Sequence, residues 1–309
     1  EIPLRLVGSE MCIRDSVYVG HDSDFYEDLV RLKQSFPQIT TTKIHLDPRF
    51  PISRKMALNV GIKSAHYECM VFTSTDAVPQ TDRWLALMAK GFTRGEIVVG
   101  YCGVERRKGF ANYMMRAWRM MHSADWIARA VRRNPYRGTL HNIGFTKNIY
   151  FGSKGFSHLN MNIGEDDLYM QKVMTHDNVS VILSPRATLR EKMWGGMRWW
   201  MGQLRYYGSA FPFYPQQVKN YIQWELGSRA LFFITAACAL AVMPFEYKIA
   251  ALVLVLVRYL LVAIQVRRIA RRLGEASMAG CYFVYDLLSP LWAFLLGVML
   301  LRRDDRVWR

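Results

Sequence analysis

Between about residues 17 and 183, short apolar runs alternate with longer amphipathic stretches. In the stretch 25–36, for example, Leu29, Leu32 and Phe36 fall on one face of a helix, because residues three or four apart are neighbours there. Regular alternation of strands with helices predicts an α/β domain in which one mostly parallel sheet has helices on both faces. The expected strands are 17–19, 43–46, 69–73 and 96–101, and the expected helices are 25–36, 53–66 and 81–92, the last two capped by Ser53 and Thr81.

Three apolar segments follow a change of composition after Gly227, at residues 230–243, 249–266 and 283–301. With their flanking residues, each approaches the roughly 20 residues that cross a bilayer, and the short link between the first two predicts a helical hairpin. Arg258 and Asp286 interrupt the apolar runs, which is costly unless these residues face protein, water or lipid headgroups. The sequence therefore predicts two or three transmembrane helices. The alternative is a set of buried helices in a soluble domain.

Arginines mark the ends of these segments. Cytoplasmic loops carry an excess of Lys and Arg, so the cluster after the second segment predicts a cytoplasmic loop. The hairpin then leaves the preceding domain in the cytoplasm as well, as at a bacterial inner membrane. A third spanning helix would carry the basic C-terminus outside, so the third segment could instead be re-entrant or interfacial around Pro290. The two arginine clusters are Arg267, Arg268, Arg271 and Arg272, and Arg302, Arg303, Arg306 and Arg309.

The first sixteen residues resemble the translated read-through of a sequencing adapter, and we exclude them from the fold. The alternative is an ordinary first strand. The expected organisation is a non-native segment at 1–16, a nucleotide-binding type of layered domain at 17–210, an interfacial linker at 211–228 and a membrane region at 229–309. In this interpretation the native N-terminus is absent from the sequence.

Charge and cysteine content narrow the classes of function. Forty-one Lys and Arg against 25 Asp and Glu give a net charge of +16, which fits nucleic acid, anionic lipid or a phosphorylated substrate. Many of the arginines flank apolar segments, where anionic headgroups account for them. The expected partner is therefore membrane lipid, and no nucleic acid is expected. The five cysteines form no CxxC pair, which favours a reducing compartment over a zinc site or a disulfide framework.

The run Phe72-Thr-Ser-Thr-Asp-Ala-Val-Pro79 places Asp76 just past the end of an expected strand. Open α/β sheets bind their ligands at this edge. A carboxylate there can hold Mg²⁺ or Mn²⁺, which neutralises a diphosphate. Taken alone, the position is also explained by an ordinary turn aspartate.

Three consecutive carboxylates, Glu165, Asp166 and Asp167, begin the apolar helix pattern of residues 168–173. The helix dipole favours carboxylates at a helix N-terminus, which by itself accounts for them. Crowding three of them also raises the pKa of at least one by mutual repulsion, which suits a general base.

A third cluster, Met193-Trp-Gly-Gly-Met-Arg-Trp-Trp-Met-Gly202, combines tryptophans with arginine. Such a surface suits stacking on sugars and phosphates, and it also suits a membrane interface. One helix can serve both purposes. His141 and His158 lack metal-ligand spacing and are interpreted as hydrogen-bonding loop residues.

In order and spacing, these motifs resemble those of membrane-bound family-two glycosyltransferases, which are inverting enzymes with a GT-A nucleotide-sugar fold and include cellulose- and hyaluronan-synthase-like members. The stretch Arg54-Lys-Met-Ala-Leu-Asn-Val-Gly-Ile62 is similar to the one that packs beside the nucleotide in that family. Ser74-Thr75-Asp76 falls at the DxD metal motif, and Glu165-Asp166 falls at the acidic pair whose Asp is the catalytic base. Arg198-Trp199 falls at the tail of the QxxRW motif, so the resemblance spans about residues 17–207.

The resemblance implies that a sugar is transferred with inversion from a nucleotide-diphosphate donor to a hydroxyl of a glycan or lipid-linked acceptor, as in polysaccharide biosynthesis. Asp166 would be the base with Glu165 beside it, and Asp76 would hold Mg²⁺ or Mn²⁺. Arg198 and Trp199 would line the mouth of the site. A homo-oligomer or a biosynthetic complex is a further expectation. The residues implied in donor binding are Asp22, Asp24, Arg54, Lys55, Asn59, Ser74 and Asp76.

Two positions depart from the family pattern. Ser74 stands where the first Asp of DxD is found, and Gly195 stands where the Gln of QxxRW is found. Because Asp76 is retained without the first Asp, we expect metal binding to persist but to be weaker. The absence of the Gln puts strictly processive synthesis in doubt. The alternative is a catalytically inactive, glycosyltransferase-like scaffold in the membrane. Retention of the Glu165-Asp166 pair argues against that alternative.

Overall fold

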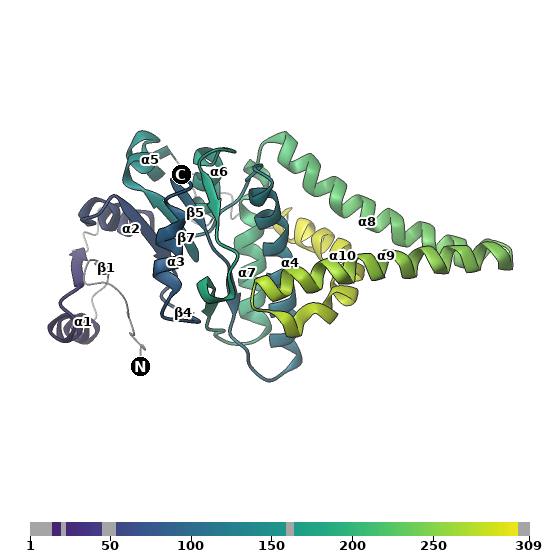
Figure 1. The fold of residues 1–309 in the computed structure, drawn as a ribbon, viewed down its shortest axis with the longest axis horizontal. Helices are drawn as coiled ribbons and strands as arrows, with labels where there is room; N and C mark the ends of the chain where they lie inside the picture. Colours follow the sequence, from purple (N-terminus) through teal and green to yellow (C-terminus); the bar gives the residue numbers. More distant parts are fainter. Residues whose placement is uncertain (1–13, 20–22, 45–53, 159–163, 302–309) are drawn as a thin grey trace.

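The computed structural model describes residues 14–19, 23–44, 54–158 and 164–301 (Figure 1). These residues form three sheets. β1 (Arg14–Val19) and β2 (Ile39–Ile44) make a two-stranded parallel sheet. The four-stranded sheet has the order β3 (Cys69–Thr73), β7 (Asn142–Thr146), β5 (Ile97–Val99) and β8 (Val179–Val181). The three-stranded sheet has the order β4 (Ala77–Pro79), β9 (Leu189–Glu191) and β6 (Cys102–Val104).

The α/β class is confirmed, but one mostly parallel sheet is wrong for the residues described. β7 pairs antiparallel with both β3 and β5, so that Ile143 lies opposite Phe72 on one side and Val99 on the other. In this sheet the β5–β8 pair is parallel. All five residues of β7 are buried, and its sequence Asn-Ile-Gly-Phe-Thr lacks the continuous apolar run that would have identified a central strand.

The early helices match their sequence patterns. α1 (Ser23–Ser35), α2 (Arg54–Ser64) and α3 (Trp84–Gly91) lie within or next to the expected ranges. Thr81 is not the N-cap of α3, because Arg83 takes that position and the Thr81 hydroxyl donates instead to the carbonyl of Arg186 at 2.7 Å. Ser53 lies outside the described residues.

The main core forms where the long helix α4 (Phe110–Val131) packs with the four-stranded sheet. Met120 and Ile127 of α4 belong to the same buried cluster as Ile97, Ile143 and Phe145. α5 (Lys147–Gly152), α6 (Glu165–Val173) and the 3₁₀ helix η1 (Gly155–His158) complete this part of the domain, and η2 (Pro185–Ala187) leads into β9.

The C-terminal third is helical. α8 (Gln216–Val242) and α9 (Phe245–Arg272) form a hairpin that projects away from the sheets (Figure 1). Within the described part of the chain, these two helices are long and apolar enough to span a membrane. α8 runs without a break through residue 228, where the sequence suggested a boundary between linker and membrane region. The remaining elements are α7 (Met197–Ser209), η3 (Phe211–Phe213), η4 (Ala276–Cys281) and α10 (Tyr282–Leu301).

α10, which contains the third apolar segment, returns to the domain and packs against α4, α7 and α8. Trp292 of α10 meets Trp200 of α7 edge to face, with ring centroids 5.0 Å apart. The two charges that interrupt the apolar runs face each other, since Arg258 of α9 is ion-paired with the fully buried Asp286 of α10. Arg229 of α8 reaches the same carboxylate at 3.2 Å, so the three helices share one buried ionic contact.

A second buried carboxylate ties the hairpin to the sheets. Glu275, three residues after α9, is fully buried and lies 2.6 Å from Arg116 of α4 and 3.0 Å from Arg190 of β9. The Tyr101 hydroxyl is 3.4 Å from the same carboxylate, and Arg190 also donates to the carbonyl of Gly274 at 2.9 Å. We refer to Glu275 with Arg116, Arg190 and Tyr101 as the junction. It fixes where the chain returns from the hairpin to the domain.

Candidate active site

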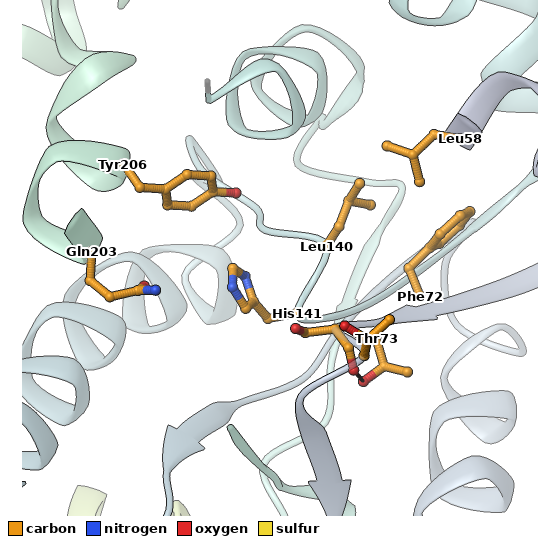
Figure 2. A pocket seen from close by; sticks show the side chains of 9 residues that line it. Leu58, Phe72, Thr73, Leu140, His141, Gln203 and Tyr206 are labelled. Carbon is orange, nitrogen blue, oxygen red and sulfur yellow. Dashed lines mark hydrogen bonds between the residues drawn. The ribbon is translucent and has the colours of Figure 1, made fainter. Parts of the chain in front are cut away.

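A pocket of about 370 Å³ opens where β3, the loop before β7, α2 and α7 meet (Figure 2). Its size is within the range of small-ligand sites. Apolar side chains supply one part of the wall and polar side chains the other. The lining residues are Leu58, Phe72, Thr73, Ser74, Thr75, Leu140, His141, Gln203 and Tyr206.

The turn between β3 and β4 brings the DxD-like segment to this pocket. The backbone N–H of Ala77 donates to the carbonyl of Ser74 at 3.1 Å and closes the turn. The N–H of Lys192 donates to the carbonyl of Asp76 at 2.8 Å, which ties the turn to the segment after β9. Ser74 and Thr75 line the pocket, and the half-buried Asp76 follows them directly in the same turn.

The acidic segment forms the first turn of α6, as its sequence predicted. Gly164 precedes it in the left-handed region, at φ +81°, which glycine adopts without steric cost. Glu165, Asp166 and Asp167 are all buried. Asp166 Oδ2 accepts hydrogen bonds from the backbone N–H of Leu140 at 3.0 Å and from the Tyr206 hydroxyl at 2.5 Å. Both donors belong to lining residues, so Asp166 lies directly behind the pocket wall.

Asp167 has its hydrogen-bond partners in the buried core rather than at the pocket wall. Its Oδ2 accepts from Arg137 Nε at 2.8 Å and from the Tyr214 hydroxyl at 2.5 Å, within the buried core. Burial raises the pKa of Asp167, Arg137 opposes that rise, and the neighbouring Asp166 adds to it as a smaller cause. A raised pKa within the acidic segment was expected, but its main cause is burial rather than crowding. Asp167 is thus an ion-pair partner in the core.

Gln203 and His141 line the pocket, and buried charged side chains contact both of them. Arg119 is almost fully buried and donates to Glu191 at 2.9 Å and to Gln203 Oε1 at 2.8 Å. Because a guanidinium can only donate, this bond assigns the Gln203 oxygen to Arg119 and leaves its NH₂ to face other groups. His141 Nε2 is 3.8 Å from Glu191 Oε1, so the same buried carboxylate also backs His141.

The aromatic cluster of α7 meets the pocket at residues other than those expected. Arg198 is exposed, and Trp199 packs beside a cluster that contains Met115, Trp200 and Leu204. Neither residue lines the pocket, which is formed on this helix by Gln203 and Tyr206. Gln203, Tyr206 and Tyr207 have the spacing of the Gln, Arg and Trp in QxxRW, and that spacing was the sequence signal that could have identified them.

The other residues expected to bind the donor are distributed around α2. Leu58 of α2 lines the pocket, and Asn59 beside it accepts a hydrogen bond from the Tyr150 hydroxyl. Lys55 is half-buried one turn earlier on the same helix. Arg54 begins α2 and Asp24 lies in α1. Asp22 lies outside the described residues.

Comparison with known proteins finds similarity to solved structures. No family model matches the sequence, and no curated protein matches it. The mannosyltransferase PcManGT from Pyrobaculum calidifontis, solved in complex with GDP-Man and Mn²⁺, has a TM-score of 0.48 and 15% identity, covering 88% of this chain and 77% of that chain. A similarity this distant assigns no function to the chain, so the function must be inferred from the pocket.

The residues near the pocket suit a metal that is shared with a substrate. Among the residues that the structure describes, no group of three or more His, Cys, Asp or Glu side chains could enclose a metal ion. Mg²⁺ is commonly bound by one or two carboxylates together with substrate phosphates rather than by a complete protein cage. The carboxylate of Asp76 and the hydroxyls of Ser74 and Thr75 are hard oxygen donors of the type that Mg²⁺ and Mn²⁺ prefer.

Proposed function

We propose that this protein is a glycosyltransferase that moves a sugar from a nucleotide-diphosphate donor to a hydroxyl of a glycan or lipid-linked acceptor, with inversion. The observation that carries the proposal is the composition of one pocket. Ser74 and Thr75, from the turn that holds Asp76, line it together with Tyr206 and Leu140, the two residues that hydrogen-bond Asp166. A carboxylate suited to a metal diphosphate and a carboxylate suited to proton transfer would therefore serve the same cavity.

On the donor side, Asp76 would hold Mg²⁺ or Mn²⁺, with Ser74 and Thr75 as neighbouring oxygen donors. When bound, such an ion supplies positive charge that stabilises the departing diphosphate. Lys55 and Asn59 of α2 would face the nucleotide, which is consistent with the position of Leu58 in the pocket wall.

On the acceptor side, Asp166 would receive the proton of the attacking hydroxyl. The bonds from Leu140 and Tyr206 fix its Oδ2 at the back of the pocket, so the proton acceptor is positioned before substrate binds. Gln203 would offer its NH₂ to an acceptor oxygen, because Arg119 already holds its carbonyl oxygen. Inversion requires a single displacement, for which one such base is sufficient.

The apolar hairpin supports a location at the membrane. We propose that α8 and α9 cross a bacterial inner membrane and that the sheet domain faces the cytoplasm, since arginines cluster at the end of α9. A membrane-embedded acceptor would then reach the pocket from the side of the hairpin. Flotation with liposomes and protease protection in inverted vesicles test this placement.

The test of function is a screen of detergent-solubilised protein against UDP- and GDP-sugars with Mn²⁺, with release of the nucleotide as the readout. Turnover with one donor, and its loss in Asp166→Asn, supports the proposal. A catalytically inactive scaffold is the competing proposal, and the serine at position 74 favours it. That proposal predicts that no donor in the panel is bound or consumed.

A further inference from the structure

Asp166 has no solvent-exposed surface, although it is the carboxylate best placed for proton transfer. The half-buried Tyr206 is the pocket residue whose hydroxyl touches it, at 2.5 Å from Oδ2. Figure 2 shows the phenol extending from α7 toward Leu140, whose N–H donates to the same oxygen. An acceptor in the pocket therefore meets the Tyr206 oxygen before it can meet Asp166.

The position of Tyr206 is well fixed. Its backbone carbonyl accepts from Ser209 Oγ at 2.8 Å, and its ring packs edge-on against His141 and Tyr207, with centroids 5.8 and 5.2 Å away. The start of α6 lies against the same part of α7, because a Cβ on Gly164 would come within 2.8 Å of Ser209 Oγ. The helix that carries the phenol and the helix that carries the carboxylate are thus packed together.

From this arrangement we infer that Tyr206 is a catalytic residue that relays the proton from the acceptor hydroxyl to Asp166. The inference rests on the proposed function. A phenol hydroxyl that donates to a carboxylate still has lone pairs that can accept a proton, so it can pass one proton on while it receives another.

The acceptor oxygen forms a bond to the anomeric carbon, whose bond to the diphosphate oxygen breaks, and the bonding electrons leave with the nucleoside diphosphate. The acceptor proton moves to the Tyr206 oxygen while the Tyr206 proton moves to Asp166 Oδ2. Tyr206 ends neutral and Asp166 ends protonated, so no free tyrosinate is formed.

The test compares Tyr206→Phe with Tyr207→Phe, which removes a hydroxyl from the adjacent, buried tyrosine of the same helix. A relay predicts that Tyr206→Phe lowers transfer roughly 10²–10⁴-fold, the usual contribution of positioned acid–base groups, while donor binding is unchanged. Tyr207→Phe should retain wild-type transfer. If Tyr206→Phe transfers sugar at the wild-type rate, or faster because a barrier to Asp166 has been removed, the relay is wrong.

Two further measurements separate a relay from a structural role. A fluorotyrosine at position 206 keeps the ring but makes the phenol more acidic, so it should change the transfer rate and its pH profile without lowering the melting temperature. The transfer rate can also be measured in mixtures of H₂O and D₂O. If two protons move in the rate-limiting step, the rate depends on deuterium content along a curve, and if one proton moves, along a straight line. A straight line for the wild type would overturn the relay.

The failure of the relay can be told apart from the failure of the proposed function. The transfer rates of the wild type and of Tyr206→Phe are both measured with the donor found in the nucleotide-sugar screen. If the wild type transfers sugar and Tyr206→Phe does so equally well, the relay fails and the function stands. If the wild type neither binds nor consumes any donor, the proposed function fails, and the relay fails with it.

Discussion

Two of the buried carboxylates in this molecule, Asp166 at the pocket wall and Glu275 at the junction, are held differently. At the junction, Glu275 lies against Arg116 and Arg190 at 2.6 and 3.0 Å. At the pocket wall, the hydrogen bonds described for Asp166 come from a backbone N–H and a phenol. Both arginines pair with Glu275, and none of these three residues lines the pocket. Burial alone therefore does not identify a candidate base. Contact with residues that line the pocket separates Asp166 from Glu275.

The largest expected effect is on the pocket side, at Asp76. Asp76→Ala should abolish donor binding that depends on Mg²⁺ or Mn²⁺ and leave the fold intact, because the turn is closed by backbone hydrogen bonds that do not involve this side chain. Calorimetric titration with nucleoside diphosphate and Mn²⁺ measures the effect. Ser74→Asp is the matched variant and should keep or tighten metal affinity. Normal turnover by Asp76→Ala would show that the metal assignment is wrong.

On the junction side, Glu275→Ala should cost about 3–5 kcal/mol of unfolding free energy, because it leaves two arginines without their buried partner. The matched control is Glu105→Ala, which breaks the exposed pair with Arg107, where the two side chains are 42% and 48% exposed. An exposed pair contributes about 0–1 kcal/mol. Denaturant unfolding in detergent provides the measurement, and equal losses for the two variants would contradict the role given to the junction.

A smaller effect is expected where α6 begins. Gly164→Ala should destabilise the protein by about 1–2 kcal/mol, because an L-residue is strained in the left-handed region and its Cβ would approach Ser209 Oγ. Gly152 is the control, since a Cβ there meets nothing within 4 Å and its φ is not in the positive range. If Gly164→Ala lowers the transfer rate at a temperature where the variant is still folded, the start of α6 positions Asp166.

The smallest effect concerns pH and His122, which packs beside Arg137 and the ring of Trp118. Burial first, and then Arg137 and Arg119, lower the pKa of His122 well below its usual 6.5. The unfolded chain therefore binds a proton near pH 6.5 that the folded chain does not, so stability is full above this pH and falls below it. The contribution of His122 to the slope approaches about 1.4 kcal/mol per pH unit below pH 6.5.

His122→Gln should remove that slope between pH 6.5 and pH 5, as followed by thermal unfolding. His176, whose side chain is 73% exposed, is the control, and His176→Gln should keep the slope. A stability difference between the wild type and His122→Gln that stays constant over this interval would contradict the expected behaviour of His122.

The local parts of the fold could be predicted from the sequence. β3, α2 and the start of α6 were predicted at or near their observed bounds because each depends on short-range periodicity and on helix-end residues. The antiparallel insertion of β7 and the return of α10 onto α7 could not, because they depend on contacts between residues far apart in the chain. Arg258 and Asp286 were recognised as needing partners, but their mutual pairing across 28 positions became visible only in the structure.

The candidate site was predictable in its acidic residues and less so in its walls. Ser74 and the neighbourhood of Asp166 were expected at a shared site, and the pocket brings them together. The sequence favours the conspicuous Arg198-Trp199 pair over Gln203 and Tyr206, which lie on the same helix. The sequence accounts for Asp167 only as a helix-start carboxylate, since nothing in the sequence pairs it with Arg137 thirty residues earlier.

The most direct test of the account is the rate of sugar transfer by Asp166→Asn and Asp167→Asn, measured in single turnover with the identified donor at a temperature where both variants are folded. Asparagine keeps the shape of the side chain but cannot serve as the base. We expect Asp166→Asn to lose roughly 10²–10⁴-fold in rate with unchanged donor affinity. We expect Asp167→Asn to lose stability, because Arg137 loses its charged partner, while its rate stays close to wild type. Equal losses in rate, or a larger loss for Asp167→Asn, would contradict the assignment of Asp166 as the base.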